Sequence, residues 1–305
     1  MEFIKPGINI DFVGKRKAAM IFSLILILCG IISLVIKGGP LYGIDFAGGT
    51  SIQVKFNESI TTSEVKELLK ETEIGKSTIQ QYGEAKDYEF IIRTKISDER
   101  MEWLTENVKA NLLKRFTNEQ FEIRKVEMVG PKVGKDLRKK GINSIFYALL
   151  GILIYITVRF EVKFAVGAVA ALVHDVLITV GIFSITNKEF NLTIIAALLA
   201  IVGYSLNDTI IVYDRIRENI RKRKREKLPN IINSSINEVL SRTILTSTTT
   251  LFVVLSIFFL AGGVIHNFAF ALLIGIIVGT YSSIYIASPI VIILDEIFAG
   301  KKAKR

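Results

Sequence analysis

Polar residues inside an apolar run are the first candidates for chemistry in this sequence. The run at residues 201–219 reads IVGYSLNDTIIVYDRIREN and contains, within its apolar part, Tyr204, Ser205, Asn207 and Asp208. Asp208 lies six residues before Asp214, where the charged end begins, which is roughly 9 Å of helix rise. A carboxylate at such a depth in a membrane helix is costly and usually marks an ion path or a buried pair. The pattern therefore predicts a proton or ion site at Asp208.

Neighbouring residues suggest how such a site is controlled. Ser205 and Tyr204 lie three and four residues before Asp208, so we expect them on its face of the helix, bonded to its carboxylate. Arg242 begins the next apolar run, and Thr246 follows one turn later. A cation beside Asp208 favours its charged form and burial favours its neutral form, so a movement of Arg242 would change its protonation. The alternative is a static ion pair that fixes helix packing, with Arg242 extended to the membrane interface.

Two further polar groups precede this run. His174 and Asp175 lie in an apolar stretch, and we expect Asp175 to contribute to the ion path and His174 to make a packing hydrogen bond. Asp45 stands among Gly43, Gly48 and Gly49, a pattern that favours a structural role at the base of a folded region. The only other histidine is His266 and the only cysteine is Cys29, so we expect no metal site and no cofactor.

The surrounding elements are typical of a multi-pass membrane protein. Half of the 305 residues are hydrophobic, and the mean hydropathy is +0.43. Six apolar runs are each near the ~20 residues that cross a bilayer, at 18–36, 142–158, 164–186, 192–213, 243–263 and 268–294. The excess of Lys and Arg between alternate runs places both termini in the cytoplasm of a cell membrane and residues 37–141 outside. The predicted divisions are 1–17, 18–36, 37–141, 142–294 with a basic cytoplasmic loop at 214–242, and the tail 295–305.

The outside region has the pattern of a small α+β domain. Four alternating runs, at 50–56, 78–82, 88–94 and 121–128, predict strands. Thr61 with Glu64 forms a capping-box signature for one helix, and Ser97 is the expected cap of a second. The order β-α-β-β-α-β is that of the ferredoxin-like unit. Residues 135–140 are then interpreted as a linker or a basic interfacial anchor, and 231–240 as a separate amphipathic helix in the membrane plane.

The net charge of +10 does not indicate a nucleic-acid partner. Much of it comes from a basic run at 215–227 that directly follows an apolar run, as in cytoplasmic loops that also contact anionic lipids. The sequence contains no nucleophile–base pattern and no Gly-rich phosphate loop, so we do not expect an enzyme.

Several strings together resemble the SecF family of protein-export membrane subunits. They are GIDFAGGT at 43–50, VHDV at 173–176, YSLNDT at 204–209, YDRIREN at 213–219 and SRT at 241–243. The first string is shared with the sister subunit SecD, whereas YSLND and DRIREN are the specific ones. The resemblance covers nearly the whole chain, and its single outside region with six spans is similar to a free-standing SecF.

The resemblance implies a transporter fold of the resistance-nodulation-division kind. It also implies a SecD partner and association with the SecYEG channel. The implied function is use of the proton gradient to promote late steps in the export of unfolded polypeptides. The resemblance further implies that Asp208 and Arg242 are the intramembrane ionisable pair. Two rivals remain open, a passive assembly or chaperone subunit and an ion-driven small-molecule exporter. Small residues of the last run fit close packing either within the bundle or against SecD, namely Gly275, Gly279, Ser282, Ser283 and Ala287.

Overall fold

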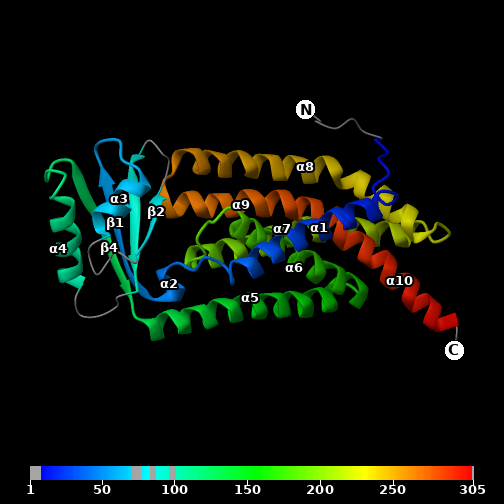
Figure 1. Cartoon of the computed structure of the whole chain (residues 1–305). Coiled ribbons are helices and arrows are strands. Elements are labelled where there is room, and N and C mark those ends of the chain that lie inside the picture. The colour runs from blue at the N-terminus through cyan, green and yellow to red at the C-terminus, as the bar shows by residue number, and fades with distance from the viewer. Residues whose placement is uncertain (1–7, 71–76, 83–86, 96–100, 304–305) are drawn as a thin grey trace.

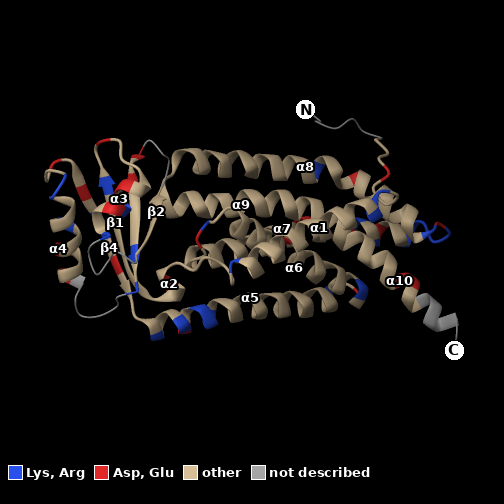
Figure 2. Ribbon diagram, in the orientation of Figure 1, with Lys and Arg blue, Asp and Glu red and all other residues tan. Residues whose placement is uncertain are grey.

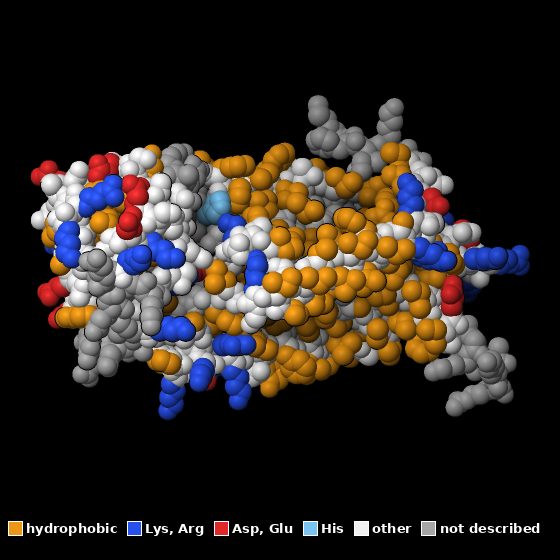
Figure 3. Space-filling model, viewed as in Figure 1, with side chains coloured by type: hydrophobic (Ala, Val, Ile, Leu, Met, Phe, Trp, Pro, Cys, Tyr) orange, Lys and Arg blue, Asp and Glu red, His pale blue; other side chains and the backbone are white. Residues whose placement is uncertain are grey.

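The computed structural model describes residues 8–70, 77–82, 87–95 and 101–303. A small sheet lies at one end of a long helix bundle (Figure 1). Within the described residues, six helices are long and apolar enough to cross a membrane. They are α1 (Arg16–Ile36), α5 (Pro131–Arg159), α6 (Val162–Ile185), α7 (Leu192–Lys222), α8 (Leu228–Leu260) and the segment formed by α9 (Gly263–Ser282), a π-helical turn (Ser283–Ala287) and α10 (Ser288–Ala303). Hydrophobic side chains cover much of the face of this bundle that Figure 3 shows.

The sheet has four antiparallel strands in the order β2-β3-β1-β4. Its strands are β1 (Gly49–Phe56), β2 (Thr78–Tyr82), β3 (Glu89–Thr94) and β4 (Phe121–Val129). Helices α3 (Thr62–Leu69) and α4 (Met101–Leu112) follow β1 and β3, respectively, and share one hydrophobic core with the sheet. Period-2 alternation explains this core, because Ile52, Val54 and Phe56 point to the helix side while Ser51 and Gln53 point to the other. The uncovered face looks toward the helix bundle (Figure 1).

The capping box predicted for α3 is confirmed. The Thr61 hydroxyl accepts the backbone N–H of Glu64, and the Glu64 carboxylate accepts the N–H of Thr61. These bonds and the nearby Arg115 lower the pKa of Glu64 below its usual value. Ser97, the expected cap of the next helix, lies outside the described residues.

Three helices extend beyond the predicted spans. α5 begins at Pro131, a favoured residue at the first helical position, so residues 135–140 form helix and not a flexible linker. α7 continues to Lys222 and α8 begins at Leu228, which makes most of the expected 214–242 loop helical. Residues 231–240 are not a separate in-plane helix, because α8 is continuous and buries Ile231, Ile232, Ile236 and Leu240 against the bundle. Ion pairs such as Glu218–Lys222 stabilise the helical ends.

Small residues bring two pairs of helices into close contact, α1 with α6 and α9 with α7. A Cβ at Gly30 of α1 would lie 2.8 Å from the Cα of Gly181 in α6. In α9, a Cβ at Gly279 would lie 2.9 Å from that of Ser205, and one at Gly275 would meet Ile201. Gly275 and Gly279 therefore pack α9 against α7, and Ser282, Ser283 and Ala287 are also buried, so these small residues pack within the bundle of this chain.

Candidate functional site

Asp208 is completely buried on α7, where it faces α8 and α9. Its Oδ2 atom accepts long hydrogen bonds from Ser247 Oγ at 3.4 Å and Thr280 Oγ1 at 3.3 Å. The two hydroxyls lie 2.7 Å from each other. Among the described residues, Asp208 Oδ1 has no hydrogen-bond partner. A buried carboxylate with so few donors is expensive while it is charged, so this group is sensitive to any change in water or cation access.

Asp175 is also completely buried, but its carboxylate is well bonded. Oδ2 accepts Ser205 Oγ of α7 at 2.6 Å and Ser282 Oγ of α9 at 2.9 Å, and Oδ1 lies 2.9 Å from His174 Nδ1. One carboxylate on α6 thus connects three helices. His174 Nε2 has no hydrogen-bond partner among the described residues, and the ring stacks on Tyr281 at 6.2 Å between centroids. The expected packing bond of His174 is therefore made to Asp175.

Asp175→Ala is expected to destabilise the bundle by about 2 kcal/mol or more, because it leaves the buried Ser205 hydroxyl and His174 Nδ1 without their partner and removes one of the two bonds of Ser282. Thermal unfolding of the purified chain in detergent measures this effect. Ser256→Ala is the control, since the Ser256 hydroxyl is exposed and bonds only to its own helix at Phe252. Equal melting temperatures for the two variants would contradict the role of Asp175 as a connecting group.

The expected support of Asp208 by Ser205 and Tyr204 is wrong for this structure. Ser205 donates to Asp175, and the Tyr204 hydroxyl lies 3.4 Å from Thr250 Oγ1 of α8. Residues three and four positions apart differ by about 60° and 40° around a helix axis. That difference turns Ser205 toward α6 and Tyr204 toward α8. Asn207, one position before Asp208, is exposed on the outside of the bundle.

Arg242 does not meet Asp208 in this state. Its side chain is exposed, and it takes part in none of the ion pairs found among the described residues. The Thr246 hydroxyl bonds back to the carbonyl oxygens of Arg242 and Thr243, so it does not extend toward the carboxylate either. Ser247, one position further on, is the α8 residue that faces Asp208. Ser247 and Thr280 were not predicted, since hydroxyls in apolar helices commonly bond their own backbone and give no distinct signal.

The glycine-rich segment at 43–49 fastens the sheet to α7. Asp45 Oδ2 accepts the backbone N–H of Leu192 at 3.0 Å, where a carboxylate is favoured by the helix dipole. Gly48 and Gly49 adopt φ values of 74° and 114°. A Cβ at Gly49 would lie 2.2 Å from the Thr94 carbonyl oxygen, so both conformation and space require glycine.

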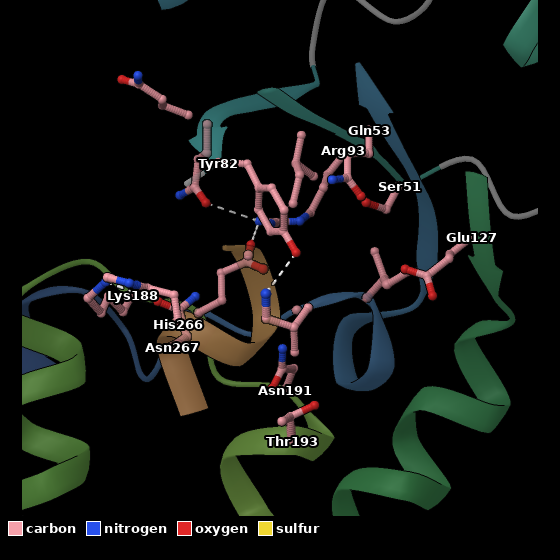
Figure 4. A pocket seen from close by; sticks show the side chains of 18 of the residues that line it. Ser51, Gln53, Tyr82, Arg93, Glu127, Lys188, Asn191, Thr193, His266 and Asn267 are labelled. Atoms are coloured by element: carbon pink, nitrogen blue, oxygen red, sulfur yellow. Dashed lines mark hydrogen bonds and ion pairs between the residues drawn. The ribbon is translucent and has the colours of Figure 1, made fainter. Parts of the chain in front are cut away.

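Two more contacts attach the uncovered sheet face to the helix ends (Figure 4). Arg93 of β3 forms an ion pair with Glu189, which precedes α7, and both side chains are largely buried. Burial lowers the pKa of Arg93 to about 10, so it is still a cation at neutral pH. The Tyr82 hydroxyl accepts the backbone N–H of Val264 at 2.8 Å, at the start of α9.

Fold and site together define a multi-pass membrane protein with two buried carboxyl groups inside its helix bundle and a sheet fastened to one end. The model for "Protein export membrane protein SecD/SecF, C-terminal" matches residues 108–297, and that for the "SecD/SecF GG Motif" matches residues 39–60. The first covers more than half of the chain. The second contains the Asp45 segment.

Full-length relatives are more specific. The protein translocase subunit SecF of Calditerrivibrio nitroreducens is 48% identical over 97% of this chain and 98% of its own length. That of Vibrio alginolyticus is 44% identical over 94% and 90%. This chain belongs to the SecF family of protein translocase subunits.

Solved structures give the same assignment. The crystal structure of SecDF, a translocon-associated membrane protein from Thermus thermophilus, matches with a TM-score of 0.84 and 34% identity over 95% of this chain. A second SecDF structure, in a super-membrane-facing form, matches with a TM-score of 0.71 and 33% identity over the whole chain. This chain spans only 39% and 41% of those SecDF chains.

Proposed function

We propose that this chain acts with SecD as an auxiliary subunit of the Sec translocase and uses the proton gradient to promote late steps of protein export. The observation that carries this proposal is the position of Asp208. It is a buried, weakly bonded carboxyl group on α7. The first residue of α7, Leu192, is bonded to Asp45 and so connects this helix to the sheet. Protonation removes the charge of Asp208 and its need for polar partners, so the packing of α7 against α8 and α9 changes. Because α7 is a continuous helix, a shift of α7 at Asp208 also moves its first turn and the sheet bonded to it.

The proposed orientation places the sheet outside the cell membrane and both termini in the cytoplasm. The densest basic run, at 215–227, lies at the end of the bundle away from the sheet (Figure 2), where positive charge favours the cytoplasmic side. In this arrangement residues 37–141 form an extracytoplasmic domain, for which the strand order β2-β3-β1-β4 with two helices on one face supports a ferredoxin-like fold. Residues 142–294 and 18–36 then form the membrane bundle.

The SecD partner is proposed to cover an open face of α7. Its exposed side carries Ala196, Ala200, Gly203 and Asn207, at a spacing that allows another helix to approach closely. Exposed Arg242 on α8 is a second polar group that hydrocarbon does not satisfy. The length of the SecDF chains, of which this chain matches about two fifths, leaves room for such a partner half. The SecYEG channel, the unfolded exported polypeptide and membrane lipids complete the proposed partners.

Site residues have separate roles in this proposal. Asp208 takes up and releases the proton, while Asp175, with His174 and Ser205, holds α6, α7 and α9 in register next to it. Arg242 acts in a second state, in which a rotation of α8 or the arrival of the partner brings it to Asp208. Tyr204, Asn207 and Thr246 line the parts of α7 and α8 that such a rotation would change.

Export into inverted membrane vesicles tests this function. Vesicles that contain the translocase and SecD are compared with and without this chain, and with and without a proton gradient. We expect the gradient to raise completed export several-fold only when the chain is present, and a protonophore to remove the increase. Replacing sodium with potassium in the buffer distinguishes a proton-driven from a sodium-driven process, because only the sodium-driven process would lose its stimulation. Equal stimulation without the chain would favour the passive assembly subunit, and export of small molecules alone would favour the exporter.

A further inference from the structure

A polar cleft separates the uncovered sheet face from the ends of the membrane helices (Figure 4). Its volume is about 760 Å³. The sheet contributes Gln53, Tyr82 and Arg93 to one wall, and the helix ends contribute Asn191, His266 and Asn267 to the other. The ion pair and hydrogen bonds that fasten the sheet cross this space but do not fill it. The proton site at Asp208 lies elsewhere, so the cleft needs its own explanation.

The charges of the cleft do not select an ionic ligand. Three cations and three anions line it, namely Arg93, Lys125, Lys188, Asp45, Glu127 and Glu189. Arg93 and Glu189 neutralise each other. A phosphate group, a polyanion or a metal cation would meet as many repelling as attracting charges.

Carboxamide side chains are the distinctive feature of the lining. In Gln80, Asn187, Asn191 and Asn267 the amide oxygen already accepts a hydrogen bond within the protein, from Arg93, Lys37, Ile194 and Lys188, respectively. Their NH₂ groups make no hydrogen bond to another described residue. Each amide therefore presents donors that no described residue uses, and such donors suit a neutral ligand that is rich in carbonyl oxygens.

Among the described residues, the outer edge of β2 has no paired strand, and β2 lines the same cleft. Four consecutive residues of β2, at positions 79–82, line it, although successive side chains of a strand point to opposite faces. The cleft thus runs along the edge of β2. That strand reads TIQQY, without charge or proline, whereas the other edge strand, β4, carries Glu122, Arg124, Lys125 and Glu127. Edge strands are normally blunted by such charges, and no other described segment pairs with the outer side of β2.

We propose that this cleft binds an extended, unfolded polypeptide segment, which adds to β2 as a fifth strand and gives its remaining carbonyl oxygens to the amide side chains. A strand occupies roughly 160 Å³ per residue, from spacings of about 3.3, 4.8 and 10 Å. The cleft therefore holds about five residues, which is the length of β2. Recognition through the backbone tolerates almost any sequence. The proposal deepens the proposed function, since an exported chain emerges unfolded on this side of the membrane.

Disulfide capture by the purified full chain in detergent tests the site without any ion gradient. In a Cys29→Ser background, Gln81→Cys places a thiol on the edge of β2, and Lys66→Cys places the control thiol on exposed α3 of the same sheet region. The probe is an uncharged ten-residue peptide of Thr, Val and Ser with an activated terminal cysteine. We expect capture at Gln81→Cys to be at least tenfold faster than at Lys66→Cys. Equal rates, after correction for the reactivity of each thiol toward free cystine, would overturn the proposal.

Two changes identify the bonds that hold the peptide. A peptide N-methylated at every residue should lose the tenfold excess, because neither of its edges can donate the hydrogen bonds of a strand ladder, while a scrambled peptide should keep it. Asn267→Leu should lower capture at Gln81→Cys at least threefold by removing one amide donor. Undiminished capture of the N-methylated peptide would overturn strand addition, and unchanged capture in Asn267→Leu would overturn the role of the amides. Failure of this assay leaves gradient-driven export intact, so the two proposals fail separately.

Discussion

Asp208→Asn is expected to abolish the stimulation of export by a proton gradient, with at least a tenfold loss of the gradient-dependent rate in inverted vesicles. Asparagine preserves the volume of the side chain and retains an acceptor for Ser247 and Thr280. It cannot exchange a proton, so a gradient has no group to act on at this position. Export measured without a proton gradient should continue in the variant.

The same helix offers a matched control for this substitution. Asp214 lies six residues after Asp208, is half exposed and stands 3.7 Å from Arg159. Asp214→Asn removes a carboxylate from α7 without touching the buried site, and we expect it to retain at least half of the gradient effect. Full gradient stimulation in a folded, assembled Asp208→Asn chain would instead make Asp208 structural and favour the passive assembly subunit.

The fold was largely predictable because its elements depend on local patterns. Long apolar runs located the six membrane helices, and the Thr61–Glu64 signature located α3. The ends of the helices were less predictable. Residues 214–222 and 228–242 contain many charged or polar side chains yet remain helical, because i,i+4 ion pairs and contacts between α7 and α8 stabilise them.

The two buried carboxyl groups of the candidate site were predictable from the sequence, but their partners were not. Spacing along a helix shows which side chains share a side, but it does not show which neighbouring helix that side meets. Ser205 was therefore assigned to Asp208, although the packing of α6 gives it to Asp175. The spacing of Arg242 likewise says nothing about rotation of α8, which turns Ser247 inward and Arg242 outward. Hydroxyl groups such as Thr280 are recognisable as partners only once three helices are placed together.

Reversing the charge of Arg93 should detach the sheet from the start of α7. Arg93 and Glu189 are only 13% and 16% exposed, so Arg93→Glu would bury two carboxylates side by side. Breaking a buried ion pair in this way costs about 3–5 kcal/mol. We expect a matching loss of stability in thermal unfolding of the full chain, and faster hydrogen exchange in β3 and at residues 186–191. The reversed pair, Arg93→Glu with Glu189→Arg, should recover most of the loss.

A second ion pair in the same region provides a control, which shows whether the effect of Arg93→Glu comes from detaching the sheet or from charge reversal in general. Arg115 and Glu64 lie 2.9 Å apart on the helix-covered side of the sheet, 51% and 36% exposed, where water screens them. Arg115→Glu should cost no more than about 1 kcal/mol. If Arg93→Glu were equally mild, the ion pair would not fasten the sheet, and other contacts, such as those of Asp45 and Tyr82, would connect it to α7 and α9. If it is severe and also removes gradient stimulation while Asp208 is intact, movement of α7 reaches the sheet through Glu189.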